Sequence, residues 1–348
     1  MDDKDFLESP VFIGGHRKSG TTLLLNLLDS HPELLTYPAD SGFFYGYFPI
    51  SEIENYSIQQ KIDAILSLPV QNLESELNRL SDEDRKDIGF DLDKFKKKIC
   101  LLNSESDITS KQMLKNLISF YKDFFLVSSS YKKWVEKTTS SEIYASEIFQ
   151  WFPNAKFIHV IRDPRDNWGS LLSGWDARYR NLNDSKERLL QSLIDRCKLG
   201  MEFGKYNQDI FGSKKYLIVK YEDLTQKPEE TMKKISSFLE IKYDSILLKP
   251  TICGKLWEGN NFEGKKFKSI SNVNINRWKE RISEKDGMII EYFFEDIMKY
   301  YDYQLEFGLR EKVNAAKEHY KWQNYAQNYS FKTVKDIPFY SKNKKQIK

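Results

Sequence analysis

The sequence predicts an α/β fold: a doubly wound parallel sheet with a P-loop-like turn after its first strand and a helical insertion. Short apolar runs alternate with segments of helical period along most of the chain, which is typical of a parallel sheet covered by helices. The run at residues 157–161 is almost wholly apolar, as in a strand covered on both faces. A glycine-containing segment joins the first apolar run to the first helical segment, and such sheets often begin with this unit.

The first third of the chain is expected to contain a strand, a loop, a helix and the insertion. Residues 11–15 form a short apolar run that ends in glycines, and residues 20–30 carry leucines at helical spacing. From residue 51 to residue 125 apolar side chains return every three or four positions. We therefore predict a helical insertion over about residues 51–130.

After the insertion the alternation of strands and helices resumes. Strands are expected at residues 131–135, 155–161 and 216–220. Helices are expected at residues 141–151, after Pro164, at residues 186–206 and at residues 228–239.

The last part of the chain is less regular. Residues 253–283, here called the late loop, are rich in Gly, Asn, Lys and Ser and have weak periodicity, which predicts a functional loop or lid. An aromatic helix should follow at about residues 288–301. We place one domain over residues 1–310 and a C-terminal helical extension with a basic tail over residues 311–348.

Composition argues against several classes of function. The 54 basic and 51 acidic residues leave a net charge of +3, so no global field indicates a nucleic-acid or membrane-surface partner. The three cysteines are far apart and lack metal-ligand spacing, which indicates neither a disulfide framework nor a zinc site. No apolar run approaches the roughly 20 residues of a membrane span. We expect a cytoplasmic protein without a membrane anchor; the sequence carries no signal for its oligomeric state.

Residues 14–22, here called the anion loop, are the most informative segment and read Gly-Gly-His-Arg-Lys-Ser-Gly-Thr-Thr. Between a buried strand and a helix, such a loop directs successive backbone N–H groups at one place and adds the positive end of the helix dipole. Two cations, Arg17 and Lys18, and the hydroxyls of Thr21 and Thr22 belong to the same segment. We therefore predict a site for phosphate or sulfate rather than an ordinary βα turn.

The anion loop departs from the nucleoside-triphosphate pattern at one position. From Gly15 it nearly satisfies G-x-x-x-x-G-K-[ST], but Thr21 stands where the lysine belongs. A kinase needs that lysine and usually an acidic strand end for Mg²⁺, whereas the strand at residues 155–161 is followed by Arg162. Mg-ATP is therefore disfavoured as the donor, and a P-loop small-molecule or nucleotide kinase is the alternative enzyme.

A second basic motif, Arg-Asp-Pro-Arg-Asp, occupies residues 162–166, and Ser170 lies eight residues after Arg162. An arginine at a strand end and a serine two turns into the next helix can meet over one anion, because open α/β sheets bind ligands at that edge. A salt-bridged turn is the alternative for this motif taken alone. Paired with the anion loop, it favours a second phosphate site.

Residues 18–22, Lys-Ser-Gly-Thr-Thr, resemble the 5′-phosphosulfate loop of the sulfotransferases that use 3′-phosphoadenosine 5′-phosphosulfate (PAPS). The leucines that follow, up to His31-Pro32, are similar to the L-L-x-x-L-x-x-H-P pattern of the bacterial, carbohydrate and tyrosylprotein branches of that family. The segment Phe-Pro-Asn-Ala-Lys-Phe-Ile at residues 152–158 also resembles a family segment. The resemblance covers about residues 10–40 and 131–240.

This resemblance implies a PAPS-dependent sulfotransferase. Such an enzyme moves a sulfuryl group from PAPS to a hydroxyl or amine of a small-molecule, carbohydrate or other acceptor, and releases adenosine 3′,5′-bisphosphate (PAP) without a metal. It implies that Lys18 contacts the bridging oxygen and the sulfuryl group, with Arg17 nearby to stabilise the departing phosphate. Arg162 and Ser170 match the family's 3′-phosphate site. The residues implied to hold the 5′-phosphosulfate are Lys18, Ser19, Gly20, Thr21 and Thr22.

Two further strand ends carry candidate PAPS contacts. Glu-Lys-Thr at residues 136–138 is similar to a family segment near the cofactor, with Lys137 as the contact and Thr139 in place of the usual proline. Tyr221, in Val-Lys-Tyr-Glu-Asp-Leu, resembles an aromatic residue near the nucleotide. A solvated lysine and a half-buried packing tyrosine are the alternatives.

The late loop resembles the branch's Gly-Asn-Ser segment followed by Arg-Trp, but has Asn261 where the serine belongs. Lys268 and Ser269 are its candidate PAPS contacts, because a lysine-rich loop can close over phosphates by charge attraction. A solvated basic loop is the alternative. The missing serine and proline also leave open a catalytically inactive, sulfotransferase-like binding module.

A general base should help to remove the proton of the acceptor hydroxyl. In the resembling branches a carboxylate shortly after the His-Pro often serves, and Asp40 lies nearest that place, although Ala39 falls on the tyrosylprotein glutamate. A turn or N-cap role is the alternative for Asp40. His16, His31 and His159 are the other candidate bases.

Overall fold

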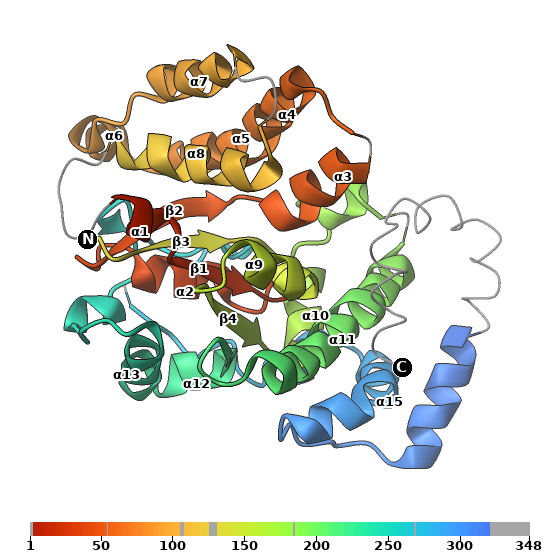
Figure 1. Ribbon diagram of the computed structural model, residues 1–348. Helices are drawn as coiled ribbons and strands as arrows, with labels where there is room; N and C mark the ends of the chain where they lie inside the picture. Colours follow the sequence, from red (N-terminus) through yellow and green to blue (C-terminus); the bar gives the residue numbers. More distant parts are fainter. Residues whose placement is uncertain are drawn as a thin grey trace.

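The structure is a computed structural model in which a parallel sheet has helices on both faces (Figure 1). It describes residues 3–53, 55–104, 108–124, 131–183, 185–267 and 269–320. Five strands form the sheet in the order β2-β3-β1-β4-β5, and every neighbouring pair is parallel. The strands are β1 (Pro10–Gly14), β2 (Leu34–Asp40), β3 (Lys133–Lys137), β4 (Lys156–Ile161) and β5 (Tyr216–Lys220). The predicted fold class is confirmed.

The central strands place the two predicted anion-binding motifs side by side. β1 pairs with β3 and β4, in a register that aligns Gly14 with His159. The chain leaves β1 toward β2 on one side and leaves β4 toward β5 on the other, so β1 and β4 flank the switch point of the sheet. Open α/β sheets bind ligands at the carboxyl ends of the strands at such a point. The anion loop and Arg162 both begin there.

Side chains of β1 alternate between the two faces of the sheet. Val11 and Ile13 pack against α2 (Thr21–Leu28) and α13 (Pro228–Leu239). Phe12 belongs to the opposite cluster, where it makes edge contacts with Trp134. Both faces are therefore buried, which explains the nearly continuous apolar sequence of these strands.

The described part of the predicted insertion is helical and covers the β2 end of the sheet (Figure 1). Its helices are α3 (Phe48–Ile53), α4 (Ile58–Ile65), α5 (Gln71–Leu77), α6 (Asp82–Ile88), α7 (Leu92–Cys100) and α8 (Ser110–Lys122). Residues 105–107 and 125–130 lie outside the described residues. α5 and α8 contact β2 directly, so the insertion borders the part of the site where β2 ends.

The other helices cover the sheet and its β5 side. They are α1 (Asp3–Leu7), α9 (Ala145–Trp151), α10 (Pro164–Leu172), α11 (Lys186–Phe211), α12 (Tyr221–Gln226), α14 (Trp278–Arg281) and α15 (Glu284–Tyr300). Residues 309–320 are also helical and pack Ala315 into the cluster of α11 and α15, whereas the predicted tail from residue 321 lies outside the described residues. Among the helices described, none is long and apolar enough to span a membrane.

Strand β2 is an element that sequence analysis did not predict. Its residues are buried from Leu34 to Ala39, so the segment lacks the polar and apolar alternation of a half-exposed strand. Pro38 also interrupts it, and the register with β3 shifts between Thr36 and Asp40. β2 is an edge strand of the sheet, where a proline is tolerated because one side needs no backbone donor.

Candidate active site

The anion loop takes its shape from backbone conformations that few residues adopt. Gly15 has φ 137°, and a Cβ there would lie 2.2 Å from the Val160 carbonyl oxygen. Lys18 has φ 67°, in the left-handed region, and Gly20 has φ 100° at the N-cap of α2. Gly20 supplies no side-chain cap, so the first N–H groups of α2 are available to a ligand.

Two neighbouring elements hold the anion loop from behind. The buried carboxylate of Glu142 accepts the Gly15 N–H at 2.8 Å, and burial raises the pKa of Glu142 to about 7. Asn167 on α10 donates to the Arg17 carbonyl at 3.1 Å and to the Ser19 hydroxyl at 3.3 Å. The Ser19 side chain is therefore buried against Asn167, and its hydroxyl helps to fix the loop.

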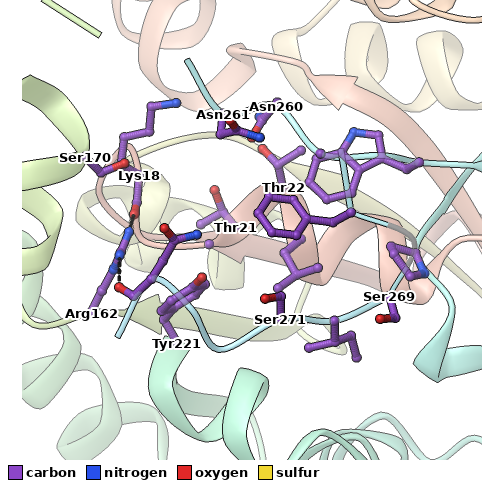
Figure 2. A pocket seen from close by; sticks show the side chains of 18 residues that line it. Lys18, Thr21, Thr22, Arg162, Ser170, Tyr221, Asn260, Asn261, Ser269 and Ser271 are labelled. Carbon is purple, nitrogen blue, oxygen red and sulfur yellow. Dashed lines mark hydrogen bonds between the residues drawn. The ribbon is translucent and has the colours of Figure 1, made fainter. Parts of the chain in front are cut away.

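A cavity that is partly open to solvent lies between the anion loop and the late loop. Figure 2 shows the side chains of the anion loop, of the strand ends and of the late loop around the same space. The predicted residues that line it are Lys18, Gly20, Thr21, Thr22, Arg162, Ser170, Tyr221 and Ser269. Their roles stay predictions, and Lys268 lies outside the described residues.

Arg162 joins the two loops at one end of this cavity. Its guanidinium donates to the Lys18 carbonyl at 3.0 Å and to the Asn274 carbonyl at 2.7 Å (Figure 2). The same group lies 4.4 Å from the centre of the Tyr221 ring. Its buried Nε–H has no hydrogen-bond partner in the described part of the chain. Arg162 lines the cavity together with Ser170, as the 3′-phosphate prediction requires.

The ammonium of Lys18 rests on an aromatic ring of the late loop. Its Nζ lies 4.0 Å from the centre of the Phe262 ring. Burial lowers the pKa of Lys18 to about 8, and the nearby cations Arg178 and Arg162 add to this shift. Within the described residues no carboxylate pairs with Lys18, so an incoming anion would be its first charged partner.

Arg17 points away from the cavity. It donates to the Ser192 hydroxyl on α11 at 3.0 Å, and its guanidinium carbon lies 5.1 Å from the centre of the Tyr179 ring. Burial lowers the pKa of Arg17. Its side chain is not among the described groups that line the cavity, so the structure separates Arg17 from Lys18, with which the sequence had grouped it.

Lys137, which is buried, and Asp40, which is partly exposed, form an ion pair next to the anion loop. Lys137 Nζ lies 2.7 Å from Asp40 Oδ2 and 3.5 Å from Thr22 Oγ1, and only 4% of Lys137 is exposed. Asp40 also accepts hydrogen bonds from Thr139 Oγ1 at 2.5 Å and from the Gly42 N–H at 3.1 Å. Burial alone would raise the pKa of Asp40, but the Lys137 ammonium and these hydrogen bonds outweigh it and lower the pKa.

The insertion brings a second carboxylate toward this pair. Asn72 on α5 donates to the Asp40 carbonyl at 2.7 Å, and Glu76 lies one turn further on the same helix. Burial raises the pKa of Glu76, although its ion-pair partner Arg79 opposes the shift. Sequence analysis did not single out Glu76, because the insertion carries no recognisable motif.

The three candidate histidines lie away from the cavity. His16 and His159 are buried, and burial lowers the pKa of both. His159 bonds to Tyr216, and His31 bonds to the Lys242 carbonyl at 2.9 Å. None of the three is among the described side chains that line the cavity. In the described residues no cluster of His, Cys, Asp or Glu has the composition of a metal site.

Residues 10–245 match the family model described as "Sulfotransferase family". The chain belongs to the sulfotransferase family. The family resemblance of residues 10–40 and 131–240 is thereby confirmed.

Similar proteins come from several sources. The chain is 27% identical over 292 residues to protein-tyrosine sulfotransferase A of Caenorhabditis elegans, and 25% identical over 246 residues to protein-tyrosine sulfotransferase of Drosophila melanogaster. These alignments cover 79% and 68% of this chain, but 62% and 39% of the relatives, so the chain spans less than two thirds of either. The sulfotransferase domain of the olefin synthase from Synechococcus PCC 7002 has the same fold, with a TM-score of 0.54 and 16% identity over 86% of this chain and 96% of that chain.

Proposed function

We propose that the protein is a PAPS-dependent sulfotransferase. The observation that carries this proposal is a single cavity lined by residues of both predicted anion-binding motifs. The uncapped start of α2 with Lys18 is the proposed 5′-phosphosulfate site, and Arg162 with Ser170 is the proposed 3′-phosphate site. PAPS carries phosphate on both the 3′ and the 5′ side of its ribose, so it matches two such sites, whereas AMP and ATP lack the 3′-phosphate. The donor set of both sites suits anions and needs no metal.

We further propose a tyrosine hydroxyl of a protein or peptide as the acceptor. The support comes from the two relatives, which are named protein-tyrosine sulfotransferases. This proposal replaces the small-molecule or carbohydrate acceptor expected from sequence. The acceptor would approach from the side of Lys137 and Asp40, where the insertion borders the site.

The proposed chemistry is an in-line displacement at sulfur. The acceptor oxygen forms a bond to sulfur while the bond from sulfur to the bridging phosphate oxygen breaks, and the acceptor proton passes to a base. PAP is then the second product. Lys18 would stabilise the charge that develops on the bridging oxygen, and the N–H groups at the start of α2 would hold the 5′-phosphate.

PAP should raise the melting temperature far more than AMP or ATP, with or without magnesium. The reason is that PAP satisfies Arg162 and Ser170 together with the start of α2, and a ligand stabilises a protein according to its affinity. Thermal melts at equal ligand concentrations measure this. The same preparations should transfer radiolabelled sulfate from PAPS to tyrosine peptides, and not to sugars or aliphatic alcohols.

A kinase, an inactive binding module and a sulfotransferase with another acceptor each predict a different outcome in these experiments. Stronger stabilisation by Mg-ATP than by PAP would favour the kinase. Stabilisation by PAP without turnover on any acceptor would favour the inactive binding module. Transfer to sugars but not to tyrosine peptides would leave the sulfotransferase proposal intact and overturn the acceptor.

PAP binding should weaken as pH rises through about 8. Lys18 is charged below its pKa and neutral above it, and burial places that pKa at about 8 in the free protein. A bound phosphate favours the charged form, so binding above this pH takes up a proton and loses affinity. Calorimetric titrations from about pH 7 to about pH 9 measure the slope. Lys18→Arg should flatten it because arginine stays charged, and an equal slope in that variant would assign the titration to another group.

A further inference from the structure

Residues throughout the first two thirds of the late loop line the cavity, and the loop also contacts both proposed anion sites. Its residues that line the cavity include Trp257, Asn260, Asn261, Phe267, Ser271 and Asn274. The Asn274 carbonyl accepts from Arg162, and the Phe262 ring carries the Lys18 ammonium. Phe262 is seated so closely on Gly174 that a Cβ there would lie 2.3 Å from the ring. To keep these contacts, the late loop has to be fixed to the rest of the protein at both of its ends.

Asp29 fixes the first end. It lies at the C-terminus of α2 and is 7% exposed. One of its oxygens, Oδ2, accepts the Thr251 hydroxyl at 2.8 Å and the Gly254 N–H at 2.9 Å. These two residues belong to the small hairpin of β6 (Thr251–Ile252) and β7 (Lys255–Leu256), with which the late loop begins.

Asp166 fixes the second end. It lies in the first turn of α10 and is 2% exposed. Its Oδ2 accepts the Asn276 N–H at 2.7 Å, and its Oδ1 accepts the Trp278 N–H at 2.8 Å. Asn276 has φ 56°, so the backbone turns sharply where it is held. Each oxygen of this carboxylate therefore has its own backbone partner.

Burying a carboxylate is costly unless its oxygens are satisfied. Both aspartates are satisfied mainly by the late loop or its flanks, although neither lines the cavity. They also belong to different elements, α2 and α10, which carry the anion loop and the Arg162 motif. The late loop is thus tied to the same two elements that form the anion sites.

We propose that Asp29 and Asp166 are positioning residues for the nucleotide site. They hold residues 254–267 and 269–277 as a preformed wall, so that nucleotide binding does not have to order these residues. This inference deepens the proposed function and rests on it. It also differs from the lid expected from sequence, since a lid would be free at rest and ordered by its ligand.

The first test measures PAP affinity in Asp29→Ala and Asp166→Ala by calorimetry. Each change should weaken PAP binding roughly 10- to 100-fold, the size expected when a charged hydrogen-bond acceptor is lost. The KM for PAPS should rise by the same factor, while kcat at saturating PAPS stays near that of the parent protein. A fall in kcat with an unchanged KM would overturn the positioning role.

The asparagine variants separate the two anchors. Asp29→Asn should retain most PAP affinity, because both contacts with the β6–β7 hairpin use one oxygen, and asparagine keeps an acceptor oxygen. Asp166→Asn should not, because each oxygen accepts a backbone N–H and an amide nitrogen cannot accept one. Glu33→Gln is the control, since its carboxylate accepts the Lys242 N–H at 3.0 Å and does not line the cavity.

The Asp29→Ala/Asp166→Ala double variant tests whether the anchors act through one segment. Two independent structural defects would multiply their effects on PAP affinity. If the two aspartates anchor one loop, the double variant should lose less PAP affinity than the product of the two single-variant losses. The reason is that releasing either end already frees the segment. A multiplicative loss would overturn the shared role.

Hydrogen exchange of the ligand-free protein gives a readout that needs no nucleotide. Peptides from residues 254–277 should exchange faster in both alanine variants, and not in Glu33→Gln. Unchanged exchange would overturn the inference even if PAP binds the parent protein. If the alanine variants exchange faster but the parent protein does not bind PAP, the proposed function is wrong. Asp29 and Asp166 then stabilise the fold of the late loop only.

Discussion

Replacing Lys18 with alanine should lower turnover at saturating PAPS by roughly 10²–10³, the usual cost of removing a donor that stabilises developing charge. The Lys18 ammonium lies at the cavity without a carboxylate partner among the described residues, so its charge is available to the leaving oxygen. The negative charge on the leaving oxygen grows as the bond between sulfur and this oxygen breaks. Its interaction with Lys18 therefore affects kcat more than ground-state binding. Single-turnover kinetics with PAPS and a tyrosine peptide measure the change.

Arg162→Ala serves as the contrasting variant for this prediction. The 3′-phosphate that Arg162 would bind keeps its charge throughout the reaction, so its loss should raise the KM for PAPS and the Kd for PAP more than it lowers kcat. Ser170→Ala should show the same pattern with a smaller effect. Near-normal rates and PAPS affinity in both Lys18→Ala and Arg162→Ala would mean that the donor site has been assigned to the wrong cavity.

Motifs with local geometry were predictable from the sequence. Gly15 and Gly20 stand where the backbone has positive φ, and the apolar runs before and after them define the strand and the helix. Arg162 and Ser170 also fall at a strand end and on the following helix, and both border one cavity. For Arg162 and Ser170 the spacing along the chain determines the distance between the two residues, because the first turns of α10 lie between them.

Contacts between distant segments were not predictable. Lys137 and Asp40 form an ion pair only because β2 lies beside β3, and Pro38 and continuous burial hid β2 from pattern analysis. Likewise, Asp166 belongs to the recognised Arg-Asp-Pro-Arg-Asp motif, yet its partners lie more than a hundred positions away. Such pairings depend on the order of strands and the path of loops, which one sequence does not specify.

Asp40→Asn should lower turnover by roughly 10²–10⁴, the usual contribution of a general base, if Asp40 accepts the proton of the acceptor hydroxyl. The low pKa of Asp40 keeps the carboxylate ionised at neutral pH. As the pH is lowered, kcat should fall when Asp40 becomes protonated. Because the pKa of Asp40 is lowered, this fall should occur at a pH below the ordinary pKa of an aspartate. The pH profile of kcat in the parent protein and in Asp40→Asn measures both effects.

The ion pair with Lys137 gives Asp40 a second possible role, and a matched variant separates the two. Thr139→Val removes the hydroxyl that donates to Asp40 Oδ2 but leaves the carboxylate and Lys137 in place. It should change turnover far less than Asp40→Asn if proton transfer is the role of Asp40. If Asp40→Asn instead weakens PAP binding and keeps kcat, Asp40 acts by orienting Lys137 beside Thr22. Unchanged turnover and PAP affinity in Asp40→Asn would remove Asp40 from the mechanism and make Glu76 the next base to test, because its raised pKa makes it the stronger base.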